Sequence, residues 1–110
     1  MKIKVTKNPF EEWERIEFPA FPQGTEVVVG SESEHEGWFE AKIQGRETYV
    51  PGQFITDQHL NRDYNPTELA VEIGDTVTIK ETHHGWFLAE DARGVKGWVL
   101  ADYTDWSADS

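Results

Sequence analysis

The chain has 110 residues, a formal net charge of −11 at pH 7, five tryptophans and no cysteine. The lack of cysteine excludes disulfides and thiolate zinc sites as sources of stability. The acidic balance argues against nucleic acid and anionic membranes as partners and favours basic ligands. No apolar run reaches membrane-spanning length and the N-terminus lacks the apolar core of a secretory signal, so we expect a cytoplasmic protein.

A pattern with a period near two, clearest at 76–80 where apolar and polar residues alternate, predicts short strands along most of the chain. In chain order they cover 3–6, then 27–29, 38–43 and 47–50, and finally 76–80, 86–90 and 95–99. Gly45 and Gly94 stand where tight hairpin turns are needed. No segment has the 3.6-residue periodicity of an amphipathic helix. The pattern therefore predicts an all-β protein.

Two of these series of strands are copies of each other. Glu36-Gly37-Trp38-Phe39-Glu40-Ala41 recurs 48 residues later as His84-Gly85-Trp86-Phe87-Leu88-Ala89. Each copy runs on into an aromatic-Val step, at 49–50 and at 98–99. Such a repeat predicts two copies of one supersecondary unit. We predict two modules, 1–57 and 58–110, which pack together because the linker at 56–59 is too short to act as a flexible tether.

Four ordered motifs of the second module resemble a Src homology 3 (SH3) domain. They lie at 60–64, 68–75, 85–87 and 97–103, where that family has Ala-Leu-Tyr-Asp-Tyr, an acidic stretch ending in Gly-Asp, a Trp pair and Gly-Leu-Phe-Pro-Ser-Asn-Tyr. The first module is similar through 9–13, 24–25, 38–39 and 49–54. The pairing resembles tandem modules of bacterial proteins. The resemblance implies two small SH3-like β barrels in tandem.

The family binds proline-rich peptides in the polyproline II conformation through an aromatic groove. The resemblance implies that the second module would use Tyr64, Trp86 and Tyr103 for the groove, and that the first would use Trp13, Trp38, Pro51, Gln53 and Phe54. Trp38 and Trp86 hold a position that is usually exposed, so we expect both to face solvent. Glu68 and Glu72 stand where acidic residues pair with a ligand Lys or Arg.

Both modules depart from the family's groove. Arg62 and Glu11 replace its first Tyr, and Leu100 replaces its Pro. We predict non-catalytic binding of a protein or peptide ligand, proline-rich or basic. The alternatives are a structural tandem scaffold with degenerate or occluded grooves and, third, a cell-wall-binding module.

Catalytic and metal-binding functions find no support in the sequence. There is no Ser or Cys nucleophile in a recognisable setting and no phosphate-binding Gly loop. His35, His83 and His84 lie in equivalent loops of the two copies but lack the further ligands that a metal needs. We therefore predict no catalytic residue, no metal and no cofactor.

Overall fold

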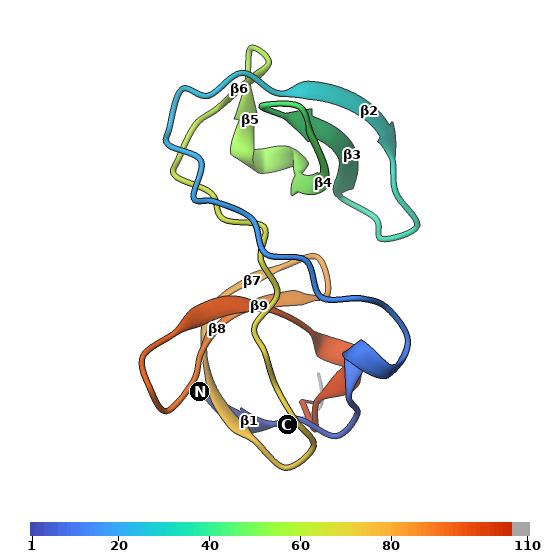
Figure 1. Cartoon of the computed structure of the whole chain (residues 1–110), viewed down its shortest axis with the longest axis vertical. Coiled ribbons are helices and arrows are strands. Elements are labelled where there is room, and N and C mark those ends of the chain that lie inside the picture. The colour runs from blue at the N-terminus through green and yellow to red at the C-terminus, as the bar shows by residue number, and fades with distance from the viewer. Residues whose placement is uncertain (107–110) are drawn as a thin grey trace. The chain divides into compact units, whose positions relative to one another are not determined.

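The computed structural model describes residues 1–106, whose regular secondary structure is nearly all β-strand (Figure 1). These residues contain three 3-10 turns and no α-helix, and no helix among them is long and apolar enough to cross a membrane. The strands are β1 (Lys2–Lys4), β2 (Val28–Glu32), β3 (Trp38–Ile43), β4 (Arg46–Pro51), β5 (Ile55–Thr56), β6 (His59–Leu60), β7 (Thr76–His83), β8 (Trp86–Glu90) and β9 (Lys96–Leu100). The 3-10 turns are η1 (Pro9–Glu11), η2 (Gly52–Phe54) and η3 (Ala101–Tyr103). The all-β prediction is confirmed.

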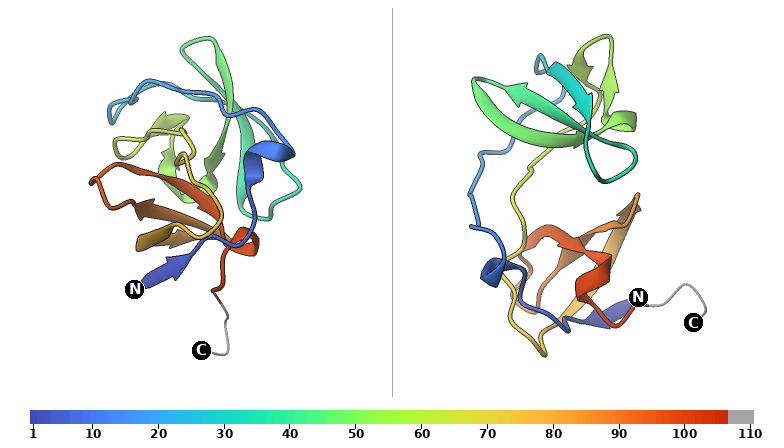
Figure 2. Two further views of the ribbon diagram at one scale, coloured as in Figure 1. Left: turned by 60° about the horizontal axis from the view of Figure 1, so that its bottom comes forward. Right: turned by 90° about the vertical axis from the view of Figure 1, so that its right-hand side faces the viewer.

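The chain divides into two compact units, and the sequence of unit 2 lies between the two segments of unit 1. Unit 1 comprises Met1–Glu17 and the segment that begins at Thr67, and unit 2 comprises Phe18–Pro66. Figure 2 shows the blue β1 in the same unit as the orange and red strands, whereas the green strands belong to the other unit. This division differs from the predicted modules 1–57 and 58–110, for a reason given below.

Unit 1 contains an antiparallel sheet in the order β1-β7-β8-β9. Ile3 of β1 pairs with Val77 of β7, and Phe87 of β8 pairs with Val99 of β9. Because alternate residues of a strand point to the same face, these side chains reach one core. Its buried members are Ile3, Val5, Leu69, Val71, Val77, Phe87, Ala89, Val99 and Ala101.

Unit 2 contains a three-stranded sheet in the order β2-β3-β4 and the short hairpin β5-β6. Phe21, Val27, Ile43, Val50 and Leu60 are fully buried. Phe21 and Tyr64 exchange two backbone hydrogen bonds, of 2.7 and 2.8 Å. This pair joins the segment that enters the unit to the segment that leaves it.

None of the three sheets closes into a barrel through the strand pairing of residues 1–106. The arrangement as two SH3-like barrels therefore stays a prediction.

The sequence repeat corresponds to a repeated arrangement of strands. Trp38 and Phe39 of β3 pair with Pro51 and Val50 of β4, as Trp86 and Phe87 of β8 pair with Leu100 and Val99 of β9. The residue after β4 donates to the carbonyl of Gly37, and the residue after β9 donates to that of Gly85, both at 2.9 Å. Three strands followed by a 3-10 turn are thus common to both units.

In each unit, one further segment forms backbone hydrogen bonds to the loop before the repeated strands, and this segment comes from a different place in the sequence in each unit. In unit 1, Val5 accepts from the amide of Gly74 and donates to Asp75, at 2.8 and 2.9 Å. In unit 2, Leu60 accepts from Gly24 and donates to Thr25, both at 2.8 Å. Val5 and Leu60 therefore occupy equivalent positions in the two units. Val5 precedes the repeated strands of unit 1 in the sequence, whereas Leu60 follows the repeated strands of unit 2.

The segment predicted as a linker between the modules lies inside unit 2. Residues 56–59 form the turn of the β5-β6 hairpin inside unit 2, with left-handed backbone at Asp57 (φ 51°) and Gln58 (φ 64°). The motif at 60–64 was assigned to the second module, but it completes the unit that precedes it in the sequence. The predicted boundary therefore falls within one unit instead of between two.

Candidate functional site

The structure groups the predicted site residues differently from the sequence prediction. Unit 1 holds Trp13, Glu68, Glu72, Trp86 and Tyr103, and unit 2 holds Trp38, Pro51, Gln53, Phe54 and Tyr64. Trp13, predicted for the first module, thus lies with the site residues of the second, and Tyr64, predicted for the second, lies with those of the first, because the units divide at other positions than the predicted boundary.

Most of the predicted residues of unit 2 are buried. Trp38, Phe54 and Tyr64 are 5%, 3% and 3% exposed, and Pro51 is fully buried. The expectation that Trp38 faces solvent is therefore wrong for this structure. Gln53 is exposed, and its carbonyl accepts from Asn61 Nδ2 at 2.8 Å.

Tyr64 has a structural role in unit 2. Its hydroxyl donates to the carbonyl of Tyr49 at 2.6 Å, and its ring meets that of Phe54 edge-on, with centroids 5.5 Å apart. Burial raises the pKa of Tyr64 far above the ordinary tyrosine value. The guanidinium of Arg62 lies 4.4 Å from the Phe54 ring centroid. Phe54 is thus already contacted by a cation and a ring of its own unit.

Unit 1 brings together Trp13 and Tyr103, whose ring centroids lie 5.5 Å apart at an interplanar angle of 38°. Both side chains are half-buried. Trp13 follows η1, which begins where the Asn8 side chain accepts from the Phe10 amide at 3.0 Å. Pro9 stands at the first helical position, where its fixed φ suits the turn and its missing N–H has no cost. The backbone amide of Trp13 donates to the Pro9 carbonyl at 3.1 Å, which fixes the backbone position from which the indole side chain extends.

Tyr103 is the last residue of η3, and its backbone carbonyl accepts from the amides of Thr6 and Lys7 at 2.8 and 3.3 Å. Its hydroxyl donates to Glu12 Oε2. The Lys7 ammonium lies 5.7 Å from the ring centroid. The hydrogen bond to Glu12, then partial burial, then the charges of Glu12 and Asp102 raise the pKa of Tyr103.

Glu68 anchors the other ring. Trp13 Nε1 donates to Glu68 Oε2 at 2.8 Å, and Arg15 Nε donates to the Glu68 carbonyl at 2.9 Å. Burial raises the pKa of the Glu68 carboxyl, although the Trp13 hydrogen bond and the Arg15 charge oppose this shift. We call Glu12, Trp13, Glu68 and Tyr103 the aromatic–acidic cluster. In it, a carboxylate holds the polar end of each ring.

The other two predicted residues of unit 1 occupy separate places. Trp86 is half-buried at the start of β8, opposite Leu100 of β9. Glu72 is exposed in the loop before β7, where its amide donates to Asp75 Oδ2 at 2.9 Å. The structure thus brings three of the five together directly, namely Trp13, Glu68 and Tyr103.

Sequence reasoning missed the roles of Lys7, Glu12 and Arg15. One signal was present, because Asn8-Pro9 is the pairing of N-cap and first helical residue that starts a helical turn. That turn carries Glu12 and Trp13 towards Tyr103. Among residues 1–106, no three His, Cys, Asp or Glu side chains are grouped to hold a metal ion.

Comparisons with protein-family models, with curated proteins and with solved structures found no significant match. The functional argument therefore rests on the geometry of the cluster and on the motifs of the sequence.

Proposed function

We propose that unit 1 is a non-catalytic module that binds an extended protein or peptide segment at the aromatic–acidic cluster. The observation that carries this proposal is the Trp13–Tyr103 pair, half-buried and held by Glu68 and Glu12 at its polar ends. Aromatic side chains with few rotatable bonds lose little entropy on binding and dominate the energy of such contacts. The two carboxylates favour a ligand that carries Lys or Arg beside its apolar residues.

A proline-rich segment suits such a surface because polyproline II is already ordered before it binds. The same proposal assigns both units to SH3-like barrels. In unit 2, the segment around Leu60, which comes last in the sequence of that unit, takes the place that the segment around Val5 has in unit 1. The backbone contacts that Val5 and Leu60 make in their units support this assignment. The cytoplasmic location belongs to this proposal too, as does the absence of nucleic acid and membrane partners.

Unit 2 favours the second candidate function, that of a structural scaffold. Trp38, Pro51, Phe54 and Tyr64 are buried, and Arg62 covers part of the Phe54 ring. These side chains stabilise the unit, so we propose that its predicted groove takes no peptide.

An amide-shift titration of the labelled full chain tests the proposal. The probes are a ten-residue peptide with Pro-X-X-Pro spacing and one Arg, and the same peptide with Gln in place of Arg. We expect shifts at 7–15, 68–72 and 101–103, with the Arg peptide binding more tightly. Trp13→Ala should weaken binding about tenfold, or about 1.4 kcal/mol, since a central aromatic anchor is lost.

The matched control is Val95→Ala, which shortens an exposed apolar side chain outside the aromatic–acidic cluster and should leave this binding unchanged. Glu68→Gln should reduce the difference between the two peptides, because the carboxylate charge is lost while a hydrogen-bond acceptor remains. If neither peptide shifts any amide, or if folded Trp13→Ala binds as the parent does, the scaffold function applies to unit 1 as well.

A further inference from the structure

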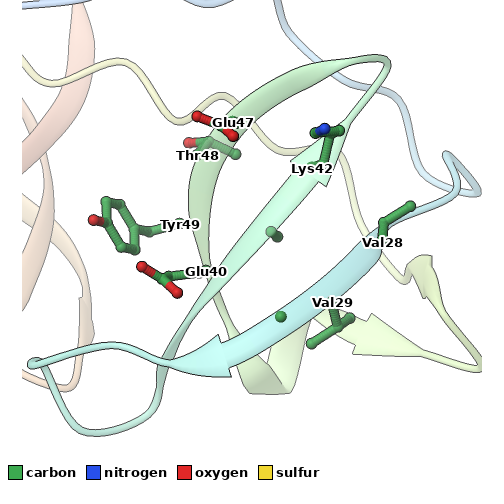
Figure 3. Close-up of a pocket in the computed structure, with 9 residues that line it drawn as sticks. Val28, Val29, Glu40, Lys42, Glu47, Thr48 and Tyr49 are labelled. Carbon is green, nitrogen blue, oxygen red and sulfur yellow. The ribbon is translucent and has the colours of Figure 1, made fainter.

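A hollow of about 360 Å³ lies on the β2-β3-β4 sheet of unit 2 (Figure 3). Its volume is within the range of about 300–1,000 Å³ that is usual for small-ligand sites. It is lined by Val28, Val29, Gly30, Glu40, Ala41, Lys42, Glu47, Thr48 and Tyr49. None of these is a predicted groove residue, so this surface is separate from the proposed peptide site of unit 1.

Strand register places five of these side chains on one face of the sheet. Val28, Lys42 and Glu47 form one row across the three strands, and Glu40 and Tyr49 form the next. Residues paired across antiparallel strands share a face, and so do residues two apart along a strand. Figure 3 shows Glu40 and Tyr49 side by side, with Lys42 and Glu47 farther along the same strands.

This face has apolar surface and charges that the fold does not use. Val28 is 61% exposed and Tyr49 is 52% exposed. Within residues 1–106, no ion pair and no side-chain hydrogen bond engages Glu40, Lys42 or Glu47. Two carboxylates therefore stand beside an exposed ring with only one ammonium group near them.

We propose that this hollow binds a Lys or Arg side chain of an extended partner peptide. The aliphatic stem would lie on Val28 and the Tyr49 ring, since long basic side chains cover apolar surface with their methylene groups. The cation would meet Glu40 or Glu47 and the edge of the ring. The peptide must supply the positive charge because the hollow has two carboxylates and one ammonium, in a chain of net charge −11.

Lys42 gives the proposal a second, opposite consequence. Its ammonium shares the row of Glu47, so it repels an incoming cation and competes for that carboxylate. Removing this charge should strengthen binding, whereas removing either carboxylate should weaken it. A second copy of the chain is a poorer occupant, because two chains of net charge −11 repel each other.

The test is an amide-shift titration of the full chain with the end-blocked pentapeptide Ala-Lys-Val-Lys-Ala. We expect shifts in β2, β3 and β4. Glu40→Gln and Glu47→Gln should each weaken binding about threefold, which is the scale of one partly exposed ion pair, and Lys42→Gln should strengthen it about threefold. Tyr49→Ala should weaken it about tenfold. The control is Glu34→Gln, the same charge change outside the hollow, which should leave the affinity unchanged.

Three outcomes would overturn the proposal. In the first, Glu34→Gln weakens binding as much as Glu40→Gln, which indicates attraction to the acidic surface in general. In the second, shifts are confined to unit 1, which leaves the function proposed there intact and excludes this site. In the third, β2-β3-β4 amides shift with protein concentration and not with peptide, which indicates self-association. Because the hollow lies in unit 2, this proposal does not rest on the function proposed for unit 1.

Discussion

At the scale of single residues, carboxylates fix the aromatic rings of unit 1. Glu68 accepts from the Trp13 indole at 2.8 Å, and Glu12 accepts from the Tyr103 hydroxyl. Both acceptors are acidic residues that the sequence presents among many others. Composition alone assigns such residues to a solvated face, and only the folded backbone shows which two of them meet a ring donor.

Trp13→Phe should change how stability depends on pH. The folded-state pKa of Glu68 is raised by burial, and the lost hydrogen bond had opposed that shift, so the pKa should rise further. A carboxyl with a raised folded-state pKa contributes stability that is full below its unfolded pKa of about 4.3 and is lost as pH rises through the folded pKa. The variant should therefore lose more unfolding free energy than the parent between pH 4 and pH 7.

The measurement is urea unfolding at several pH values, with a carboxyl titration by NMR. Trp106→Phe serves as the control, because its exposed indole meets Phe87 edge-on and makes no hydrogen bond to Glu68. If the pKa of Glu68 is the same in Trp13→Phe as in the parent, the indole hydrogen bond does not act on this carboxyl.

The buried hydroxyl of Tyr64 should affect the unfolding free energy at alkaline pH. Its folded-state pKa is raised by burial, so its share of stability is full below the unfolded tyrosine pKa of about 10 and is lost as pH rises above that value. Tyr64→Phe should cost about 1 kcal/mol at pH 7 through the missing hydrogen bond to the Tyr49 carbonyl. It should also lose less stability than the parent between pH 9 and pH 11. Tyrosine absorbance during alkaline unfolding checks this, and equal losses in parent and variant would contradict it.

At the scale of elements, the repeated strands were predictable and the strand pairing was not. The Gly-Trp-Phe and aromatic-Val steps recur around glycine turns in β3, β4, β8 and β9, which is a local signal. The sequence also indicated the hairpin between β8 and β9, where Gly94 has a φ of +85° and Asp91 Oδ1 accepts from the amides of Arg93 and Val95. The hairpin β5-β6 was missed because its turn residues, Asp57 and Gln58, have side chains and still adopt left-handed backbone.

Gly97 of β9 should not tolerate a side chain. A Cβ there would lie 2.6 Å from the amide nitrogen and 2.7 Å from the Cα of Leu69, and backbone atoms cannot give way as a flexible side chain can. We expect Gly97→Ala to cost about 3 kcal/mol of unfolding free energy.

The comparison variant is Gly94→Ala, where a Cβ meets nothing within 4 Å and only the positive φ opposes the substitution. It should cost about 1–2 kcal/mol. Chemical denaturation of both proteins gives the difference. A Gly97→Ala protein that is as stable as Gly94→Ala would show that the Leu69 segment does not pack there.

At the scale of the whole molecule, unit 2 is inserted into the sequence of unit 1. The motif at 60–64 lies directly before the second repeat, so sequence order favours assigning it there. Chain neighbours usually pair in space, and that rule fails for Leu60, which pairs back to Gly24 and Thr25. Non-local pairing of this kind leaves no pattern within either segment. This is why the sequence indicated two repeats, while the structure divides the chain at other positions than the predicted boundary.

Fragments should report this organisation. The fragment 18–66 contains both strands of every pair in unit 2, including the Phe21–Tyr64 pair, so we expect it to fold, with dispersed amide shifts. The fragments 1–57 and 58–110 should remain unfolded, because the first lacks Leu60 and Tyr64 and the second lacks β1. A folded 58–110 together with an unfolded 18–66 would contradict the division into these units.

The insertion also decides how the molecule responds to mechanical load. The chain begins in unit 1, and its last described residue belongs to unit 1 as well. A force applied to residue 1 and to the last described residue is therefore carried first by the contacts of residues 4–5 with 104–105, where Val5 bridges to Thr104 and the Asp105 amide donates to the Lys4 carbonyl at 2.9 Å. Unit 2 carries no tension until these contacts break, together with those that Thr6, Trp13 and Arg15 make with Tyr103 and Glu68. Its two ends meet at the Phe21–Tyr64 bridge, so tension on this unit would break the two backbone hydrogen bonds of that bridge before it reached the rest of the unit.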